Sequence, residues 1–311
     1  MNLPKYVFTS RVSSSAPESL AGVGVALVGE SVDDRGSATI NALKVLSTTV
    51  SKLRFDASNQ GIWLDGIEVN RDRLVAHLNG FERILLDITT LGLGDILHIM
   101  MAAKQGGHQA IEFLYAEPGE YTQDIPNGTD DPQRRDFNLT KNCRFRSIHG
   151  FAHEYQTNMK ASHVFFLGFE PGRLRNAFEQ RDDLNTGSYG IHFVIGVPAY
   201  QTGWESDTIR PHLRVLDEQN ISEQAITYCQ ANSIRESYLT LWDLYRQLGD
   251  ERWCFYVSPL GTKPHAVGAA LFLLETKGYD STTSLFYDHP ERISKRCKDV
   301  AAWHHVTVCL S

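Results

Sequence analysis

Residues 254–274 constrain the fold more than any other stretch of the chain, because an apolar run, a short loop and a second apolar run follow one another there. The first run is aromatic and leads into the loop 258–263. Pro264 then opens a run of helical composition, and a proline costs little there because the first helical N–H has no partner in the helix. The pattern predicts a strand, a tight loop and a helix, as in α/β proteins.

The loop before this helix has the composition of an anion site. Thr262 is a suitable N-cap for the free amides of the helix. Gly261 permits close backbone approach, and Lys263 supplies a positive charge. Together they favour a phosphate at the helix N-terminus. The alternative is a tight turn with a solvated lysine. A Walker A loop is excluded, because Thr262 separates Gly261 from Lys263 and a proline follows the lysine.

Short apolar runs rich in β-branched and aromatic residues recur along the chain, each followed by a polar or glycine-bearing loop and a helical stretch. This alternation predicts an α/β fold, Rossmann-like, with a mostly parallel sheet and helices on both faces. The expected strands are 21–29, 52–56, 83–90, 110–117, 162–169, 190–197, 225–229, 252–257, 284–287 and 305–310. The expected helices are 37–49, 70–78, 95–104, 171–181, 205–218 with a break at Pro211, 233–248 and 264–276.

A polar segment divides the chain. Residues 118–142 show no hydrophobic period and contain prolines, glycines and several acids, as in an exposed loop or an interdomain connection. We therefore expect an N-terminal α/β half over 1–122, a polar connector over 123–142 and a C-terminal α/β half over 143–311, with one continuous domain as the alternative. The polar segment is the expected site of limited proteolysis.

The composition limits the partners. A formal charge of −7 argues against nucleic acid as a partner of the whole surface. No apolar run approaches the roughly 20 residues of a membrane span, and the N-terminus has no secretory pattern. The five widely spaced cysteines, without C-x-x-C pairing, fit a reducing cytoplasm. We expect a cytoplasmic protein, with a homo-oligomer as its assembly, that uses no membrane, no metal and no cofactor.

Ligands of open parallel sheets bind outside the carboxyl ends of the strands, where neighbouring crossovers diverge. The loops in this position are 30–36, 87–94, 117–121, 168–173, 197–203 and 258–263. In the second of them, Asp87 lies within an otherwise apolar strand, and the period of two puts it on the same sheet face as Thr89, near the end of the strand. A carboxylate there needs partners, so Asp87 is expected to hold either a neighbouring loop amide or a hydroxyl of a ligand.

The same loop permits a weaker dinucleotide interpretation. Gly92 and Gly94 follow a strand and open a helix, and Glu117 ends the next strand at about the distance expected of a ribose-binding acid. Leu97 stands where the third glycine of that fingerprint belongs.

No other sequence pattern predicts a catalytic site. The sequence has no H-E-x-x-H motif and no G-x-S-x-G elbow. The acidic turn 30–35, which holds Asp33 and Arg35, could serve a catalytic loop, but a solvated turn is the favoured interpretation. His304 and His305 are expected to point to opposite faces of the last strand.

The strand end Asp87-Ile88-Thr89 and the later Gly261-Thr262-Lys263 before a helix resemble the motifs of CARF domains, the Rossmann-like sensors of cyclic oligonucleotides in prokaryotic antiviral systems. The resemblance covers two short motifs and the alternating pattern. Leu260 replaces the first of the two glycines usual before Thr-Lys, and the residues after the motif show no separate nuclease signature of the effector domain that such proteins usually append. The resemblance implies that Thr89, Thr262 and Lys263 contact phosphate and that Asp87 organises the loop.

Three functional hypotheses remain at this level. The first is a nucleotide-binding component of a bacterial antiviral defence or signalling system, which takes a phosphate-bearing small molecule and has protein partners. The second is an enzyme that hydrolyses or transfers a nucleotide or nucleoside, with Asp87 or Glu117 as general base and Lys263 on the phosphate. The third is a scaffold subunit with a vestigial pocket. The expected ligand-binding residues are Asp87, Thr89, Thr90, Glu117, Ser258, Gly261, Thr262 and Lys263.

Overall fold

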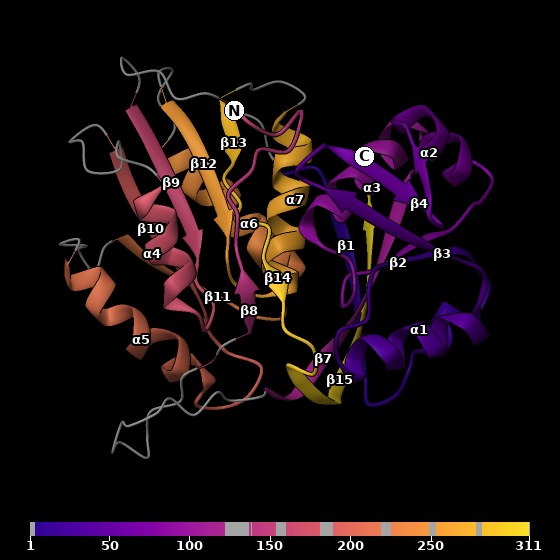
Figure 1. The fold of residues 1–311 in the computed structure, drawn as a ribbon, viewed down its shortest axis with the longest axis horizontal. Coiled ribbons are helices and arrows are strands. Elements are labelled where there is room, and N and C mark those ends of the chain that lie inside the picture. The colour runs from indigo at the N-terminus through magenta and orange to yellow at the C-terminus, as the bar shows by residue number, and fades with distance from the viewer. Residues whose placement is uncertain are drawn as a thin grey trace. The chain divides into compact units, whose positions relative to one another are not determined.

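The computed structural model describes residues 4–121, 137, 139–153, 160–180, 189–218, 225–248, 253–277 and 282–310. The chain divides into two compact units, each with its own main sheet (Figure 1). Unit 1 comprises residues 1–121 and 294–311, and unit 2 comprises residues 122–293.

The sheet of unit 1 has the strand order β1-β15-β7-β6-β2-β3-β4-β5. The strands are β1 (Val7–Ser13), β2 (Val23–Val28), β3 (Ser47–Asp56), β4 (Gly61–Leu64), β5 (Ile67–Val69), β6 (Ile84–Asp87), β7 (Ala110–Tyr121) and β15 (Cys297–Cys309). The four central strands β7, β6, β2 and β3 are parallel, whereas the two strands at each edge pair antiparallel. The expectation of a mostly parallel sheet therefore holds for the centre of this sheet, and the sheet as a whole is mixed.

The helices of unit 1 are η1 (Glu18–Leu20), α1 (Asp34–Leu46), α2 (Arg71–Leu78) and α3 (Leu93–Gln105). Of these, α1 connects the parallel neighbours β2 and β3, and α3 connects β6 and β7. The Asp33 side chain caps α1 by accepting from Gly36 N, and Asn70 caps α2 in the same way. Leu43 of α1 packs on a buried cluster that includes Ala26 of β2 and Leu85 of β6. This packing holds α1 against the sheet.

The main sheet of unit 2 has the order β11-β10-β9-β12-β13, and every pair in it is parallel. Its strands are β9 (Lys160–Phe166), β10 (Tyr189–Gly196), β11 (Ile226–Cys229), β12 (Trp253–Pro259) and β13 (Thr283–Leu285), and the short strands β8 (Thr140–Asn142) and β14 (Glu291–Arg292) pair separately. Its helices are α4 (Pro171–Glu179), α5 (Trp204–Glu218), α6 (Ile234–Leu248) and α7 (Lys263–Thr276).

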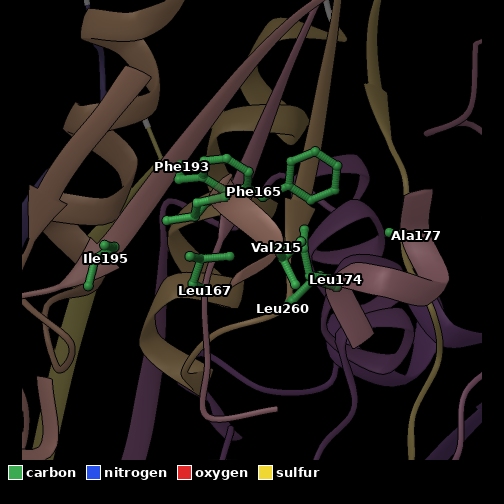
Figure 2. Close-up of a cluster of buried hydrophobic side chains, with 9 residues drawn as sticks. Phe165, Leu167, Leu174, Ala177, Phe193, Ile195, Val215 and Leu260 are labelled. Atoms are coloured by element: carbon green, nitrogen blue, oxygen red, sulfur yellow. The ribbon is translucent and has the colours of Figure 1, made fainter. Parts of the chain in front are cut away.

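Helices cover both faces of the unit 2 sheet. On one face, Phe165 of β9 lies 5.6 Å from Phe178 of α4, measured between ring centroids. On the other face, Phe255 of β12 lies 5.6 Å from Phe272 of α7. Figure 2 shows the first core, in which Phe165, Phe193 and Ile195 of the sheet meet Leu174 and Ala177 of α4 and Val215 of α5. Successive side chains of a strand point to opposite faces, so the central strand β9 is buried against helices on both sides.

Most expected elements are present with ends shifted by a few residues, including β2, β6, β9, β10, α2, α4, α6 and α7. One helix prediction is wrong: α5 continues through Pro211. The antiparallel strands β1, β4, β5, β8 and β14 were not expected. The polar segment 118–142 begins and ends in strand, in β7 and β8, while residues 122–136 and 138, where we expect proteolysis, lie outside the described residues.

The expected division of the chain also differs from the structure at its C-terminal end. Residues 294–311 were grouped with the C-terminal half, but they belong to unit 1. Their strand β15 lies between β1 and β7 and pairs with both over most of its length. Because both strands that pair with β15 belong to unit 1, β15 is part of unit 1 as well.

Candidate functional site

The predicted residues at the end of β6 are held by hydrogen bonds within unit 1. Asp87 is fully buried, and its Oδ2 accepts from the hydroxyls of Thr39 (2.7 Å) and Thr90 (2.8 Å). Its Oδ1 accepts from the backbone N–H of Thr89 at 3.0 Å. Burial raises the pKa of the Asp87 carboxyl, and these hydrogen bonds oppose that shift. Asp87 therefore holds a loop amide, which is the first of the two roles expected for it.

The two threonines extend this network to the neighbouring strands. The Thr90 hydroxyl accepts from Gly29 N at 2.9 Å, directly after β2. The Thr89 hydroxyl accepts from Ala116 N at 2.9 Å, on β7. The end of β6 is thus tied to both neighbours, which preorganises the carboxyl edge of the sheet.

Glu117 and the glycines of the dinucleotide interpretation also have local roles. Glu117 is buried and lies 2.7 Å from His304 Nε2 of β15. The amide of Gly92 donates to Asp95 at 2.7 Å, so a side chain already occupies that position at the start of α3. A Cβ at Gly94 would lie 2.4 Å from the Phe55 ring. These glycines are explained by capping and packing.

The loop after β12 is built in a similar way within unit 2. Ser258 is fully buried; its hydroxyl donates to Phe286 O (2.7 Å) and lies 2.7 Å from His163 Nε2. Because the Ser258 proton goes to the carbonyl, His163 must donate to Ser258 and cannot act as its base. The Thr262 hydroxyl donates to Ala231 O at 2.6 Å and accepts from His265 N, which confirms the predicted N-cap. Lys263 is the first residue of α7 and is half-buried.

The eight predicted residues fall into two groups. Asp87, Thr89, Thr90 and Glu117 belong to unit 1, and Ser258, Gly261, Thr262 and Lys263 belong to unit 2. The single parallel sheet that we expected would place the loops at Asp87 and Gly261, which both follow strands, at one edge of that sheet. This expectation is wrong, because β6 and β12 belong to different sheets. The residues of each group lie at the ends of parallel strands. The alternation of strands and helices along the sequence predicts such strands, but it does not show which strands belong to the same sheet.

Within unit 2, the loops after β9 and β12 lie against each other. A Cβ at Gly168 would lie 2.8 Å from Leu260 O, and a Cβ at Gly261 would lie 2.9 Å from Leu167 O. Both positions therefore require glycine for close backbone approach. Because β9 and β12 are neighbours whose chain connections run in opposite directions, these loops lie where ligands of parallel sheets bind.

Arg173 of α4 joins these two loops. Its Nε and Nη2 donate to Asp288 at 2.6 Å each, and its Nη1 donates to Leu260 O at 2.7 Å. Burial alone would raise the pKa of the Asp288 carboxyl, but the Arg173 guanidinium outweighs that effect and lowers it. The charge of the buried Arg173 is thus balanced by Asp288, and its hydrogen bond to Leu260 O ties the start of α4 to the loop after β12.

A pocket of about 540 Å³ lies in front of the N-terminus of α4. Its wall includes Lys141, the stacked rings of Phe137 and Phe169 (centroids 4.5 Å apart) and Gly172 of the first turn. No side chain of the described residues caps α4: the carboxylate of its N-cap residue Glu170 accepts instead from Leu139 N and the Thr140 hydroxyl. The pocket thus combines a helix N-terminus, a lysine and an aromatic pair.

A second cluster, in unit 1, was not expected from the sequence. Asp33 and Arg35, interpreted as part of a solvated turn, are 7% and 2% exposed. Arg35 Nη2 donates to Asp33 Oδ2 at 2.8 Å, and Arg296 Nε lies 3.5 Å from the same oxygen. The rule on strand ends does select the loop 30–36, but nothing in the local sequence indicates that Arg296 completes the cluster.

Comparison with known protein families and with curated protein sequences found no match to this chain. In the described part of the chain, no helix is both long and apolar enough to cross a membrane. The described residues also contain no group of three or more His, Cys, Asp or Glu side chains that could hold a metal ion.

Proposed function

We propose that this protein binds a nucleotide in unit 2, at the pocket in front of α4, and that unit 2 is Rossmann-like. The observation that carries the proposal is the position of the pocket. It lies at the uncapped N-terminus of the helix that follows β9, and β9 is the strand from which the chain connections of the sheet diverge. Parallel sheets bind nucleotides at this position, because the free amides and the helix dipole favour phosphate.

The side chains of the pocket supply the remaining contacts of a nucleotide. The amide of Gly172 and the ammonium of Lys141 are suited to a phosphate. The stacked pair Phe137 and Phe169 offers an aromatic surface to a base, and such stacking is tolerant of base identity. The Glu170 carboxylate can accept from a ribose hydroxyl. A dinucleotide fingerprint is missing here, since Gly168 is followed by Phe169 and Glu170, so a single nucleotide unit or an oligonucleotide ring fits better.

We place this binding activity in a bacterial antiviral defence or signalling system, with protein partners that read the ligand-bound state. The support is the resemblance of the Asp87 and Gly261 motifs to CARF domains together with the phosphate-compatible pocket. In this role Lys263, on the helix after β12, is a second phosphate contact. No turnover is required of a sensor, so the nucleotide should be recovered unchanged.

Isothermal titration calorimetry with linear and cyclic nucleotides tests the proposal. Lys141→Met should lower the affinity about ten- to hundredfold, because a charge-assisted contact contributes roughly 1.5–3 kcal/mol. Lys141 is exposed, and its one ion pair within the described part of the chain is a 3.8 Å contact with Glu291, so folding should be unaffected. The matched control is Lys160→Met, an exposed lysine at the amino end of β9.

The results separate the alternatives. Weaker binding by Lys141→Met and unchanged binding by Lys160→Met support the pocket. If Lys263→Met lowers the nucleotide affinity and Lys141→Met does not, the phosphate site lies at the start of α7 rather than at the pocket. Conversion of the nucleotide to product would favour the enzyme hypothesis, and no binding to any nucleotide in the panel would refute the proposed function.

A further inference from the structure

Unit 1 contains two buried guanidinium groups, and the Nε of each has no hydrogen-bond partner among the described residues. Arg296 is 7% exposed, and its Nε has no hydrogen-bond partner among the described residues. Its contact with Asp33, at 3.5 Å, is an ion pair without a hydrogen bond. Arg35 donates to Asp33 and Ala116 O, but its Nε is likewise without a partner in the described part of the chain. Buried donors in native proteins are nearly always paired, so these two require an explanation.

The charges around them do not balance. Asp33 contacts both guanidiniums; burial raises the pKa of its carboxyl, but Arg35 and Arg296 outweigh that effect and lower it, so it is ionised at neutral pH. Cys297 lies beside Arg35, and burial raises the pKa of its thiol to about 12, so it stays neutral. Glu117, which follows Ala116 on β7, is paired with His304 and therefore does not balance the charge of Arg35. Two positive charges therefore share one carboxylate in a buried place, which is costly without a further anion.

The position of the cluster points the same way. Asp33 and Arg35 follow β2, and β2 and β6 are the parallel neighbours from which the chain leaves toward opposite edges of the sheet. The α1 dipole adds positive potential at the same point. Guanidinium donors form a fork that matches a tetrahedral oxyanion.

We infer that Arg35 and Arg296 form an anion site of unit 1 that takes a phosphate group. This site is separate from the nucleotide pocket of unit 2 and does not depend on it. Arg296 supplies its guanidinium fork to the anion, Arg35 adds positive charge beside it, and Asp33 holds both guanidiniums in place.

Calorimetric titration of the full chain with inorganic phosphate, at constant ionic strength in chloride buffer, tests the inference. Arg296→Met removes the fork and keeps much of the stem, so phosphate affinity should fall about ten- to hundredfold. Arg296→Lys, which keeps a point charge, should lose less. Arg11→Met, on exposed β1, should leave this phosphate binding unchanged.

Stability without phosphate gives an independent readout. An unpaired buried charge opposes folding, so Arg296→Met should unfold in chloride at a urea concentration equal to or above that of the wild type. Two results would overturn the inference: no phosphate binding by the wild type, or an Arg296→Met variant that binds phosphate like the wild type. A variant that unfolds much earlier in chloride would also overturn it, because Arg296 would then be a structural partner of Asp33.

Discussion

Glu112 shows at the scale of one residue how a buried carboxylate is kept ionised. Its Oε2 lies 2.8 Å from His305 Nε2, and its two oxygens accept from Arg83 at 2.7 and 2.8 Å. Burial opposes ionisation, but hydrogen bonds from His305 and Arg83 outweigh it and lower the pKa of Glu112 from 4.5 to about 2. The group joins β7, β15 and the loop before β6.

This shift predicts a pH dependence of stability. Because the folded-state pKa lies below the unfolded value, the ionised Glu112 stabilises the fold above pH 4.5, and the contribution is lost as the pH falls toward about 2. At about 1.36 kcal/mol per pKa unit the contribution is on the order of 3 kcal/mol. We expect Glu112→Gln to be destabilised at pH 7 and to approach the wild type as the pH falls, measured by urea unfolding in steps from pH 7 to 3. Glu68→Gln, on exposed β5, is the control; a difference between Glu112→Gln and wild type that stays constant with pH would contradict the assignment.

Single residues were predicted from the sequence where their role is local. Thr262 caps α7 as expected, and His304 and His305 contact acids on opposite faces of β15. Roles that depend on distant partners were not predictable. The local sequence around Asp33 indicates a polar turn, and it does not show that Arg296, near the other end of the chain, contacts the Asp33 carboxylate.

At the scale of elements, the contact between the loops after β9 and β12 determines the geometry of the unit 2 edge. Gly168→Ala should push Leu260 away, since the new Cβ would lie 2.8 Å from its carbonyl oxygen, and Gly261→Ala should do the same at Leu167. Each should cost roughly 1–3 kcal/mol, as overpacking does. Gly172→Ala, in the first turn of α4, meets no atom within 4 Å and should be neutral or stabilising by up to about 1 kcal/mol. Urea unfolding gives the free energy of unfolding of the three variants. If all three change it equally, the two loops separate without strain and the prediction is wrong.

The elements that the sequence predicts well are those with long hydrophobic periods, such as α6 and β9. The edge strands were missed for a physical reason. β1 is largely exposed, and β4 and β5 are three or four residues long, so none of them shows a buried alternation. Pro211 was expected to break α5, yet the helix continues, because residues beyond it such as Val215 and Leu216 are buried in the core of unit 2. Packing outweighs the local preference there.

At the scale of the whole molecule, unit 2 is inserted into a hairpin of unit 1. The chain leaves unit 1 at Tyr121, the last residue of β7, and returns to β15, whose first residue, Cys297, pairs with Tyr121. The change of composition after residue 117 indicated the exit from the first unit. No change of composition marks the point where the chain returns to unit 1. That return depends on the pairing of β15 with β1, which are at opposite ends of the chain, and a local sequence pattern does not show such a pairing.

This arrangement makes a prediction about which parts of the chain can fold alone. Residues 1–121 lack β15, so β1 has no strand to pair with and β7 loses the partner along one side. We expect residues 1–121 to remain unfolded and residues 1–121 joined to 294–311 by a short Gly/Ser linker to fold, because antiparallel neighbours are readily connected by loops of about 2–5 residues. Cooperative urea unfolding and dispersed amide resonances in NMR spectra would show the folded state. A folded 1–121 fragment would instead mean that β15 is an accessory strand, and the first unit would then end where the N-terminal half was expected to end.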